Sequence, residues 1–386
     1  MPDKKQKEEK MEYAKRMMRI KESTTFKYSA MAKKPGVIDL TIGRTNFDTP
    51  KAIKDAAKKA LDEGKTSYTP TKGIPELREK IAEKLTEVNG MTNLDKEKVL
   101  VSAGAKQLIF EAVLATVGEG DSVAIPDPSW VSYESIVEFA GGKVDWLPTN
   151  PEEGFIPGER FFSALENSMP RLILLNSPNN PTGAVYPEKV IKKIVDIAER
   201  KNAWIISDEI YEELIYEGNH FSAGSIYDKC IVVNGYSKNC SMTGWRLGYA
   251  ACRDKEVIDK MNMIQEQSVS CATSFVQYGA VAAYTKDAKR DTAAMREELR
   301  KRRDYLIKRL EELDIFCIKP SGAFYAFPSF GVDDDIKLAD RLLENGVATV
   351  PGSPFGSKGK GCLRLSYGAS KIEELEEAVK RIEKTI

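Results

Sequence analysis

Histidine is nearly absent from this chain of 386 residues, which contains only His220. Most catalytic triads, histidine-rich metal sites and histidine acid–base schemes require more than one such residue in a defined arrangement. Proton transfer is therefore expected to use Lys, Tyr or carboxylate side chains. The six cysteines show no C-x-x-C spacing, which disfavours a zinc site and favours the reduced thiols of a cytosolic protein. No metal site is expected.

Net charge and long apolar runs are also missing. The 58 basic and 58 acidic residues cancel, so no overall field draws the protein to nucleic acid or to an anionic membrane. No run approaches the roughly 18 apolar residues that a membrane span needs. Residues 1–10 are charged and lack the apolar stretch of a secretory signal. A cytoplasmic protein with neither nucleic-acid nor membrane partners is expected.

Length and patterning indicate an α/β protein of about two domains, at roughly 150 residues each. Between residues 98 and 251, short apolar runs alternate with helical periods, which predicts a mainly parallel sheet with helices on both faces. Such sheets bind ligands at the carboxyl ends of their strands. A charged helix over residues 289–312 is predicted to separate this unit from a smaller α+β segment, whose strands are expected at residues 315–319, 323–327, 347–350 and 362–366.

The domain division follows from these patterns. Residues 1–48 are assigned to an N-terminal arm and part of the smaller domain, with a weakly amphipathic stretch over residues 11–20. Residues 49–286 are assigned to the large α/β domain, and residues 287–386 to the small C-terminal α+β domain.

One loop carries a lysine and an arginine among small residues, between two predicted strands at residues 230–233 and 247–252. It carries Gly, Ser and Thr in place of a helical period, so Lys238 is presented from a loop. An isolated lysine is ordinarily a surface cation. Here, however, the spacing of Gly235, Ser237, Lys238, Gly244 and Arg246, together with the residues between them, resembles the lysine-attachment motif of class I and II aminotransferases. These are fold type I enzymes that depend on pyridoxal 5'-phosphate (PLP).

Other strand ends carry polar residues that are ambiguous by themselves. The turn Gly104, Ala105, Lys106 follows a predicted strand and opens a helix, which suits either a plain turn or a phosphate cradle. Trp130 could be a core aromatic, and Asp208 could be a helix N-cap. Asn180 lies in the sequence N-N-P-T-G, which by composition alone indicates only a turn.

The family resemblance assigns these residues roles around one cofactor. It implies a seven-stranded type of sheet, a Schiff base at Lys238, phosphate binding by Arg246 and the turn at residues 104–106, and a cofactor contact by Ser237. It further implies that Trp130 stacks on the pyridine ring and Asp208 pairs with the ring nitrogen, while Asn180 and Tyr211 contact the ring oxygen.

Substrate and subunit contacts are implied in the same way. Arg364 corresponds to the arginine that holds the substrate α-carboxylate with a bidentate fork, and Gly43 lies against the same group, with Trp130 and Asn180 also near the substrate. Tyr68 corresponds to a tyrosine that reaches the cofactor phosphate of the partner subunit, which implies a homodimer with a shared active site. The family turn is usually G-E-P-D-F-x-T-P, from which Arg44, Thr45 and Asn46 depart.

The expected reaction moves an amino group from an L-amino acid, with aspartate or an aromatic residue favoured, to a 2-oxo acid such as 2-oxoglutarate. Lys238 would act as nucleophile and proton carrier, with Asp208 and Tyr211 assisting. A PLP-dependent carbon–sulfur lyase is the alternative within the same fold. A nucleotide-dependent oxidoreductase should show G-x-G-x-x-G after its first strand, and residues 102–107 do not. A PLP-binding regulator would need a basic DNA-binding module, for which the neutral chain has no spare domain.

Overall fold

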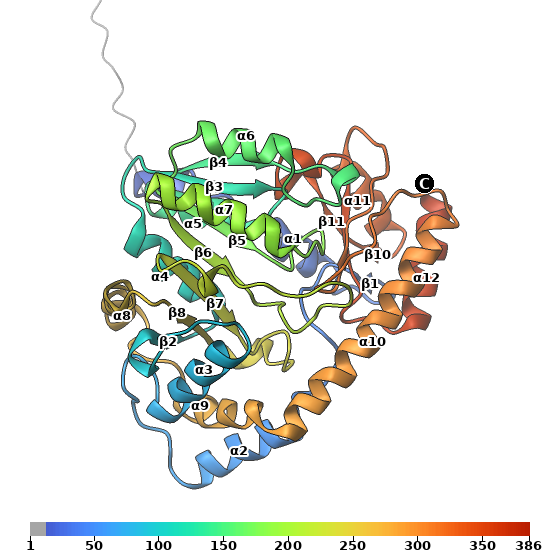
Figure 1. The fold of residues 1–386 in the computed structure, drawn as a ribbon. Coiled ribbons are helices and arrows are strands. Elements are labelled where there is room, and N and C mark those ends of the chain that lie inside the picture. Colours follow the sequence, from blue (N-terminus) through green and yellow to red (C-terminus); the bar gives the residue numbers. More distant parts are fainter. Residues whose placement is uncertain (1–12) are drawn as a thin grey trace, which may run out of the picture.

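The computed structural model describes residues 13–386, and a seven-stranded sheet forms its centre (Figure 1). The strand order is β2-β8-β7-β6-β5-β3-β4. All neighbouring strands are parallel except at β8, which runs antiparallel to both β2 and β7. The strands are β2 Val99–Ser102, β3 Ser122–Asp127, β4 Lys143–Pro148, β5 Leu172–Asn176, β6 Trp204–Asp208, β7 Cys230–Gly235 and β8 Gly248–Ala251. The prediction of a mainly parallel α/β sheet is confirmed, although the edge strand β4 was not predicted.

Helices pack on both faces of this sheet and flank the rest of the chain (Figure 1). The α-helices of the described residues are α1 Thr24–Met31, α2 Lys51–Asp62, α3 Pro75–Glu87, α4 Ala105–Thr116, α5 Ser132–Phe139, α6 Glu159–Asn167, α7 Glu188–Lys201, α8 Lys255–Ser268, α9 Ser274–Val281, α10 Lys286–Glu311, α11 Asp335–Glu344 and α12 Ile372–Thr385.

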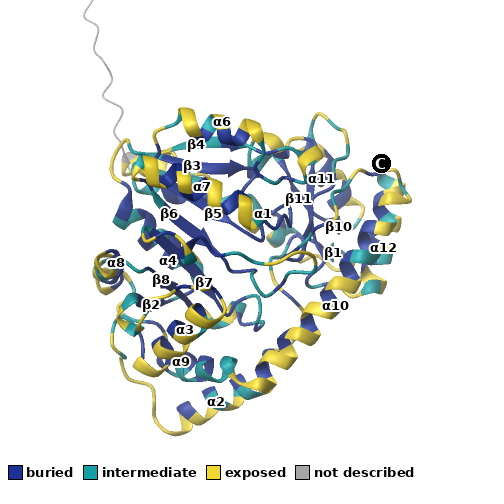
Figure 2. Ribbon diagram, in the orientation of Figure 1, coloured by how far each residue is buried: buried dark blue, intermediate teal, exposed yellow. Residues whose placement is uncertain are grey.

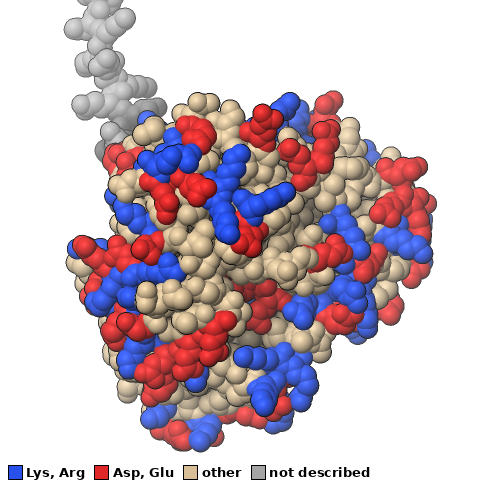
Figure 3. Space-filling view, in the orientation of Figure 1, with Lys and Arg blue, Asp and Glu red and all other residues tan. Residues whose placement is uncertain are grey.

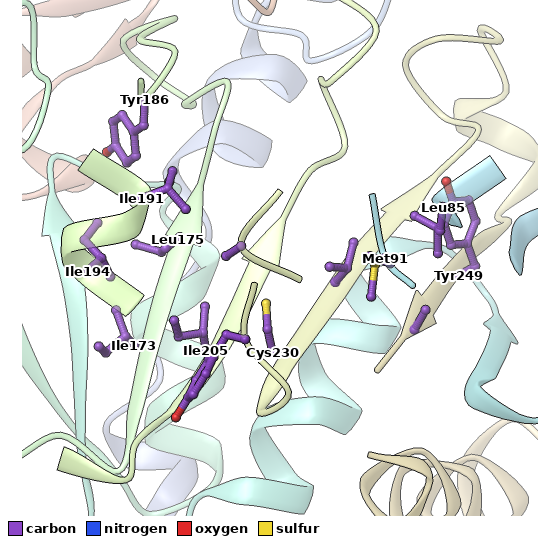
Figure 4. Close-up of a cluster of buried hydrophobic side chains, with 14 of the residues drawn as sticks. Leu85, Met91, Ile173, Leu175, Tyr186, Ile191, Ile194, Ile205, Cys230 and Tyr249 are labelled. Carbon is purple, nitrogen blue, oxygen red and sulfur yellow. The ribbon is translucent and has the colours of Figure 1, made fainter. Parts of the chain in front are cut away.

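Both faces of the central strands are buried, and successive side chains enter different cores because a strand alternates its faces. In β5, Leu172 and Leu174 pack in the core beneath α4, α5 and α8, whereas Ile173 and Leu175 pack in the core beneath α3 and α7. Figure 4 shows the second core, where Ile173 and Leu175 lie beside residues of α7. In Figure 2 the strands are dark blue, whereas the outer faces of the covering helices are yellow. This continuous burial explains why the strands read as apolar runs.

A smaller group of strands packs with the long helix α10, whose 26 residues run along one side of the molecule (Figure 1). Strand β1 Ile38–Asp39 pairs in parallel with β10 Val347–Ala348, so residues from opposite ends of the chain share one sheet. A second sheet has the order β11-β12-β9, with bounds Val350–Pro351, Leu363–Ser366 and Tyr325–Ala326. The division at residues 48 and 286 stays a prediction.

Two predicted strands of this region are wrong in detail. Residues 315–319 form no strand and contribute one isolated bridge, Phe316 to Ser329. Residues 347–350 are split between β10 and β11, which belong to different sheets because the chain pairs first with β1 and then with β12. Alternation of apolar residues cannot reveal such a change of partner.

The N-terminal arm is described from residue 13 onward, and the part of the predicted amphipathic stretch at residues 11–12 lies outside the described residues. Residues 13–20 contain only a short 3₁₀ helix, Lys15–Met18, and α1 follows it. No helix in residues 13–386 combines the length and apolar character needed to cross a bilayer. Figure 3 shows acidic and basic side chains interspersed on one face, in line with the zero net charge.

Candidate active site

The polar strand ends of the large sheet meet at one edge. Strands β5 and β6 end at Asn176 and Asp208, which are register partners. Because β8 runs antiparallel to β7, the segment joining them stays at this edge, and it carries both Lys238 and Arg246. The topology thus delivers these side chains to a common place, as expected for a parallel sheet.

Lys238 lies half-buried in the loop after β7. Its Nζ donates a hydrogen bond to the carbonyl of Gly43 at 2.5 Å and lies 5.8 Å from the ring centroid of Tyr211. Burial, with further repulsion from Arg364 and Arg246, lowers the pKa of Lys238 to about 8, although Asp208 offsets part of this. A lysine with such a pKa is partly a neutral amine near neutral pH, which is the form that attacks carbonyl groups.

Asp208 is buried at the carboxyl end of β6. Its Oδ2 accepts a hydrogen bond from the Tyr133 hydroxyl at 2.6 Å, and Asn176 Nδ2 donates to its backbone carbonyl at 3.0 Å. Burial raises the pKa of Asp208 to about 6, while the Tyr133 hydrogen bond opposes the rise. Since a buried carboxylate is stabilised by a cation, this environment favours pairing with a positively charged ring nitrogen.

Arg364 presents a rigid fork from β12 and is 1% exposed. Nη1 donates to Asn180 Oδ1 at 3.0 Å, and Nη2 donates to the Thr41 carbonyl at 2.5 Å. The guanidinium also lies 4.5 Å from the ring centroid of Tyr325. Nε is buried without a partner among the described residues, and each terminal nitrogen has a second N–H. The arginine is therefore fixed in position yet retains donors for a carboxylate.

A cradle for an anion forms where α4 begins. Gly104 is its N-cap with φ +96°, and a Cβ built there would lie 2.7 Å from Arg246 Nη2. Arg246 itself adopts φ 54° and donates from Nη1 to the Thr243 carbonyl at 3.0 Å. Free N–H groups at the helix start and an adjacent guanidinium are the donors that a phosphate needs. Only glycine allows Arg246 to approach the turn this closely.

These side chains line one cavity of about 580 Å³. Trp130 forms part of its wall, packing edge-to-face on Tyr133 with ring centroids 5.3 Å apart. The Lys106 ammonium lies 4.7 Å above the Trp130 ring. Tyr211 and Tyr325 also line the cavity, with their hydroxyl oxygens 2.9 Å apart. A nucleophilic amine, a buried carboxylate and an arginine fork thus face the same space.

Comparison with known proteins identifies the family. The model of the family "Aminotransferase class I and II" matches residues 35–382. The chain belongs to the class I and II aminotransferases. It is 41% identical over 383 residues to the aspartate/prephenate aminotransferase of Thermus thermophilus, covering 97% of this chain and 98% of that protein. It is 43% identical over 350 residues to a probable aspartate aminotransferase of Methanocaldococcus jannaschii, covering 89% of this chain and 91% of that protein.

Solved structures agree with this assignment. The aspartate aminotransferase from Thermus thermophilus with maleate matches with a TM-score of 0.93 at 40% sequence identity, over 97% of this chain and 99% of that chain. The fold is thus that of fold type I, and the enzyme is an aminotransferase. The relatives do not favour the carbon–sulfur lyase alternative.

Most residues singled out in the sequence of this aminotransferase line the cavity. The ones that do so are Gly43, Ala105, Lys106, Trp130, Asn180, Asp208, Tyr211, Ser237, Lys238, Arg246 and Arg364. Gly104 does not line the cavity, but its lack of a side chain allows the Arg246 guanidinium to approach closely. Tyr68 is 90% exposed and lies away from the cavity of its own chain, so its role in a partner's site stays a prediction.

Sequence reasoning missed Tyr133, Asn176 and Tyr325, which also line the cavity of the aminotransferase. Tyr133 lies three residues after Trp130, and Asn176 is the last residue of β5. The positions of Tyr133 and Asn176 next to residues already singled out could have indicated both as site residues. Tyr325 comes from β9, far along the chain, and no local signal places its hydroxyl beside Tyr211.

The residues of the cavity fit PLP by their chemistry. The Gly104 turn and Arg246 offer donors to a phosphate, and Lys238 offers an amine to an aldehyde. Asp208 offers a buried acceptor to a ring nitrogen, and Tyr211 a hydroxyl to a ring oxygen. Each polar group of the cofactor therefore has a chemically matching residue at this site.

Proposed function

We propose that this aminotransferase uses PLP and transfers the amino group of aspartate or an aromatic amino acid to a 2-oxo acid such as 2-oxoglutarate. The observation that carries the proposal is that Lys238, Asp208 and Arg364 face one cavity, with the Lys238 pKa lowered to about 8. The relatives named as aspartate, aspartate/prephenate and aromatic aminotransferases support the substrate choice.

Arg364 orients the substrate. Its fork binds the α-carboxylate, because Asn180 and Thr41 hold one N–H on each terminal nitrogen and leave the others for the ligand. Fixing this carboxylate places the substrate Cα in the cavity beside Lys238.

Lys238 carries the proton. When bound, PLP supplies the aldehyde that takes up the amino group and a ring that withdraws electrons from Cα. Lys238 would hold the cofactor through its amine and, as general base, would take the proton from the substrate Cα. Burial and the nearby guanidinium groups keep its pKa low enough for this exchange. Asp208 would keep the ring nitrogen protonated, and Arg246 with the Gly104 turn would neutralise the phosphate.

We further propose a cytoplasmic homodimer. The Tyr68 ring is 90% exposed, which suits a side chain that inserts into a second subunit. All six cysteines are free, which suits a reducing compartment.

A donor panel tests the proposed reaction. The holoenzyme is incubated with 2-oxoglutarate and each of aspartate, phenylalanine, tyrosine, alanine and lysine, and glutamate formation is measured. Aspartate or the aromatic donors should give the highest kcat/KM. Glutamate formation with none of these donors would refute the proposal.

A further inference from the structure

The turn at residues 44–46, which departs from the usual family sequence, is held by anchors on separate elements. Thr45 is buried, and its Oγ1 lies 2.7 Å from Ser241 Oγ in the lysine loop. Asn46 Oδ1 accepts a hydrogen bond at 2.9 Å from Arg302, a buried residue of α10. Just before the turn, the Gly43 carbonyl accepts the bond from Lys238. With its neighbours fixed, Arg44 is presented from a rigid support.

Arg44 lines the same cavity as Lys238. Within residues 13–386, its side chain makes no hydrogen bond or ion pair. It is also exposed, so it lies where the cavity meets solvent. Guanidinium groups bind carboxylates in a planar fork. Because Arg44 has no protein partner among the described residues and lies at the mouth of the cavity, it is available to bind an anionic group of the substrate.

The other charges of the cavity already have partners or assignments. Five cations line it, namely Arg44, Lys106, Lys238, Arg246 and Arg364, against one acid, Asp208. Arg246 belongs with the phosphate cradle and Arg364 with the α-carboxylate, while Lys238 donates to the Gly43 carbonyl. The Lys106 ammonium lies over two rings, 4.7 Å from Trp130 and 5.3 Å from Phe26, so cation–π contacts stabilise it. Of the five cations, Arg44 is the one for which the residues 13–386 provide no hydrogen bond, ion pair or cation–π contact.

We propose that Arg44 is a specificity residue that binds the second carboxylate of dicarboxylic substrates. The inference rests on the proposed function and narrows it to donors and acceptors with a distal acidic group. Where the family sequence usually has glutamate, this chain presents a positive charge, which attracts a second carboxylate. The preference for dicarboxylic over monocarboxylic substrates therefore depends on Arg44, in the turn after β1.

Binding of two four-carbon acids provides the test. Succinate and butyrate differ by one carboxylate, and each is titrated into the holoenzyme as a competitive inhibitor of the best amino donor. Arg44→Gln should weaken succinate binding about tenfold and leave butyrate within twofold. Arg44→Glu should weaken succinate further, and Arg44→Lys should retain most of the discrimination. Lys58→Glu, an exposed change on α2, controls for the altered net charge.

The outcomes separate the two proposals. Equal changes for both acids in the Arg44 variants, or no change for either, would overturn the role of Arg44. The same holds if Lys106→Met abolishes the preference for succinate while Arg44→Gln retains it. A failure of the transaminase proposal gives a different result, because the wild-type holoenzyme would then form no glutamate with any donor. Circular dichroism of each variant verifies the fold.

Discussion

Lys238 and Gly43 are joined by a hydrogen bond from Nζ to the backbone carbonyl at 2.5 Å, although 195 residues separate them in the chain. This contact couples the loop after β7 to the turn after β1. Since β1 pairs with β10 near the C-terminus, the reactive amine is positioned by segments from both ends of the chain. Its pKa and orientation therefore depend on the complete fold.

Cofactor uptake should become faster as the pH rises. Burial and two arginines lower the pKa of Lys238 to about 8, and the neutral amine that reacts accumulates above that pH. Reconstitution of the apoenzyme, followed by absorbance, should accelerate about fivefold from pH 7 to pH 8. Arg364→Gln removes a nearby cation, which should raise the pKa of Lys238. The midpoint of the plot of reconstitution rate against pH should then move to higher pH, while the titrations of PLP itself stay the same. An unchanged midpoint would contradict the electrostatic explanation.

Tyr133 should hold Asp208 in its ionised form. Its hydroxyl donates to Oδ2 at 2.6 Å, and this bond opposes the rise in pKa caused by burial. Tyr133→Phe should raise the Asp208 pKa further, so the acidic limb of kcat/KM shifts to higher pH. At pH 6 the loss should be about tenfold, and smaller at pH 8. Tyr186→Phe, in the core away from the cavity, should leave the profile unchanged; a uniform loss at all pH values in Tyr133→Phe would argue against the assignment.

Thr45 and Ser241 should be energetically coupled. Their hydroxyl oxygens lie 2.7 Å apart and join the turn after β1 to the lysine loop. In a double-mutant cycle with Thr45→Val and Ser241→Ala, urea unfolding of the apoenzyme should give a coupling of about 1 kcal/mol. Additive single effects would mean that the two loops are positioned independently.

Mixed dimers should reveal a shared site. Tyr68→Ala and Lys238→Ala should each be nearly inactive alone. If Tyr68 serves the partner subunit, a dimer with one subunit of each kind has one complete site, formed by Lys238 of one subunit and Tyr68 of the other. Mixing after mild dissociation should therefore restore up to about a quarter of wild-type activity, on the assumption of random pairing. Activity no greater than the sum of the separate variants would refute the shared site.

The sequence predicted the elements that bury apolar residues on both faces, such as β5 and β6, because a long apolar run has few other structures available. The cavity residues at strand ends were assigned through the family resemblance, and the parallel topology explains why those ends meet. Tyr325 could not be predicted, because its contact with Tyr211, 114 residues earlier in the chain, arises only when β9 pairs with β12 in the folded protein. The split between β10 and β11 was missed for a similar reason, since strand partners are set by tertiary packing.

Attachment of the cofactor to Lys238 is the central claim. The most direct measurement is to reduce the PLP-loaded enzyme with borohydride, digest it and locate the pyridoxyl group by mass spectrometry. The expected result is a single modified peptide carrying the group on Lys238, and no modified peptide from Lys238→Ala, which should also lack the visible absorbance of the bound cofactor. A pyridoxyl group on another lysine, or retained covalent absorbance in Lys238→Ala, would contradict it.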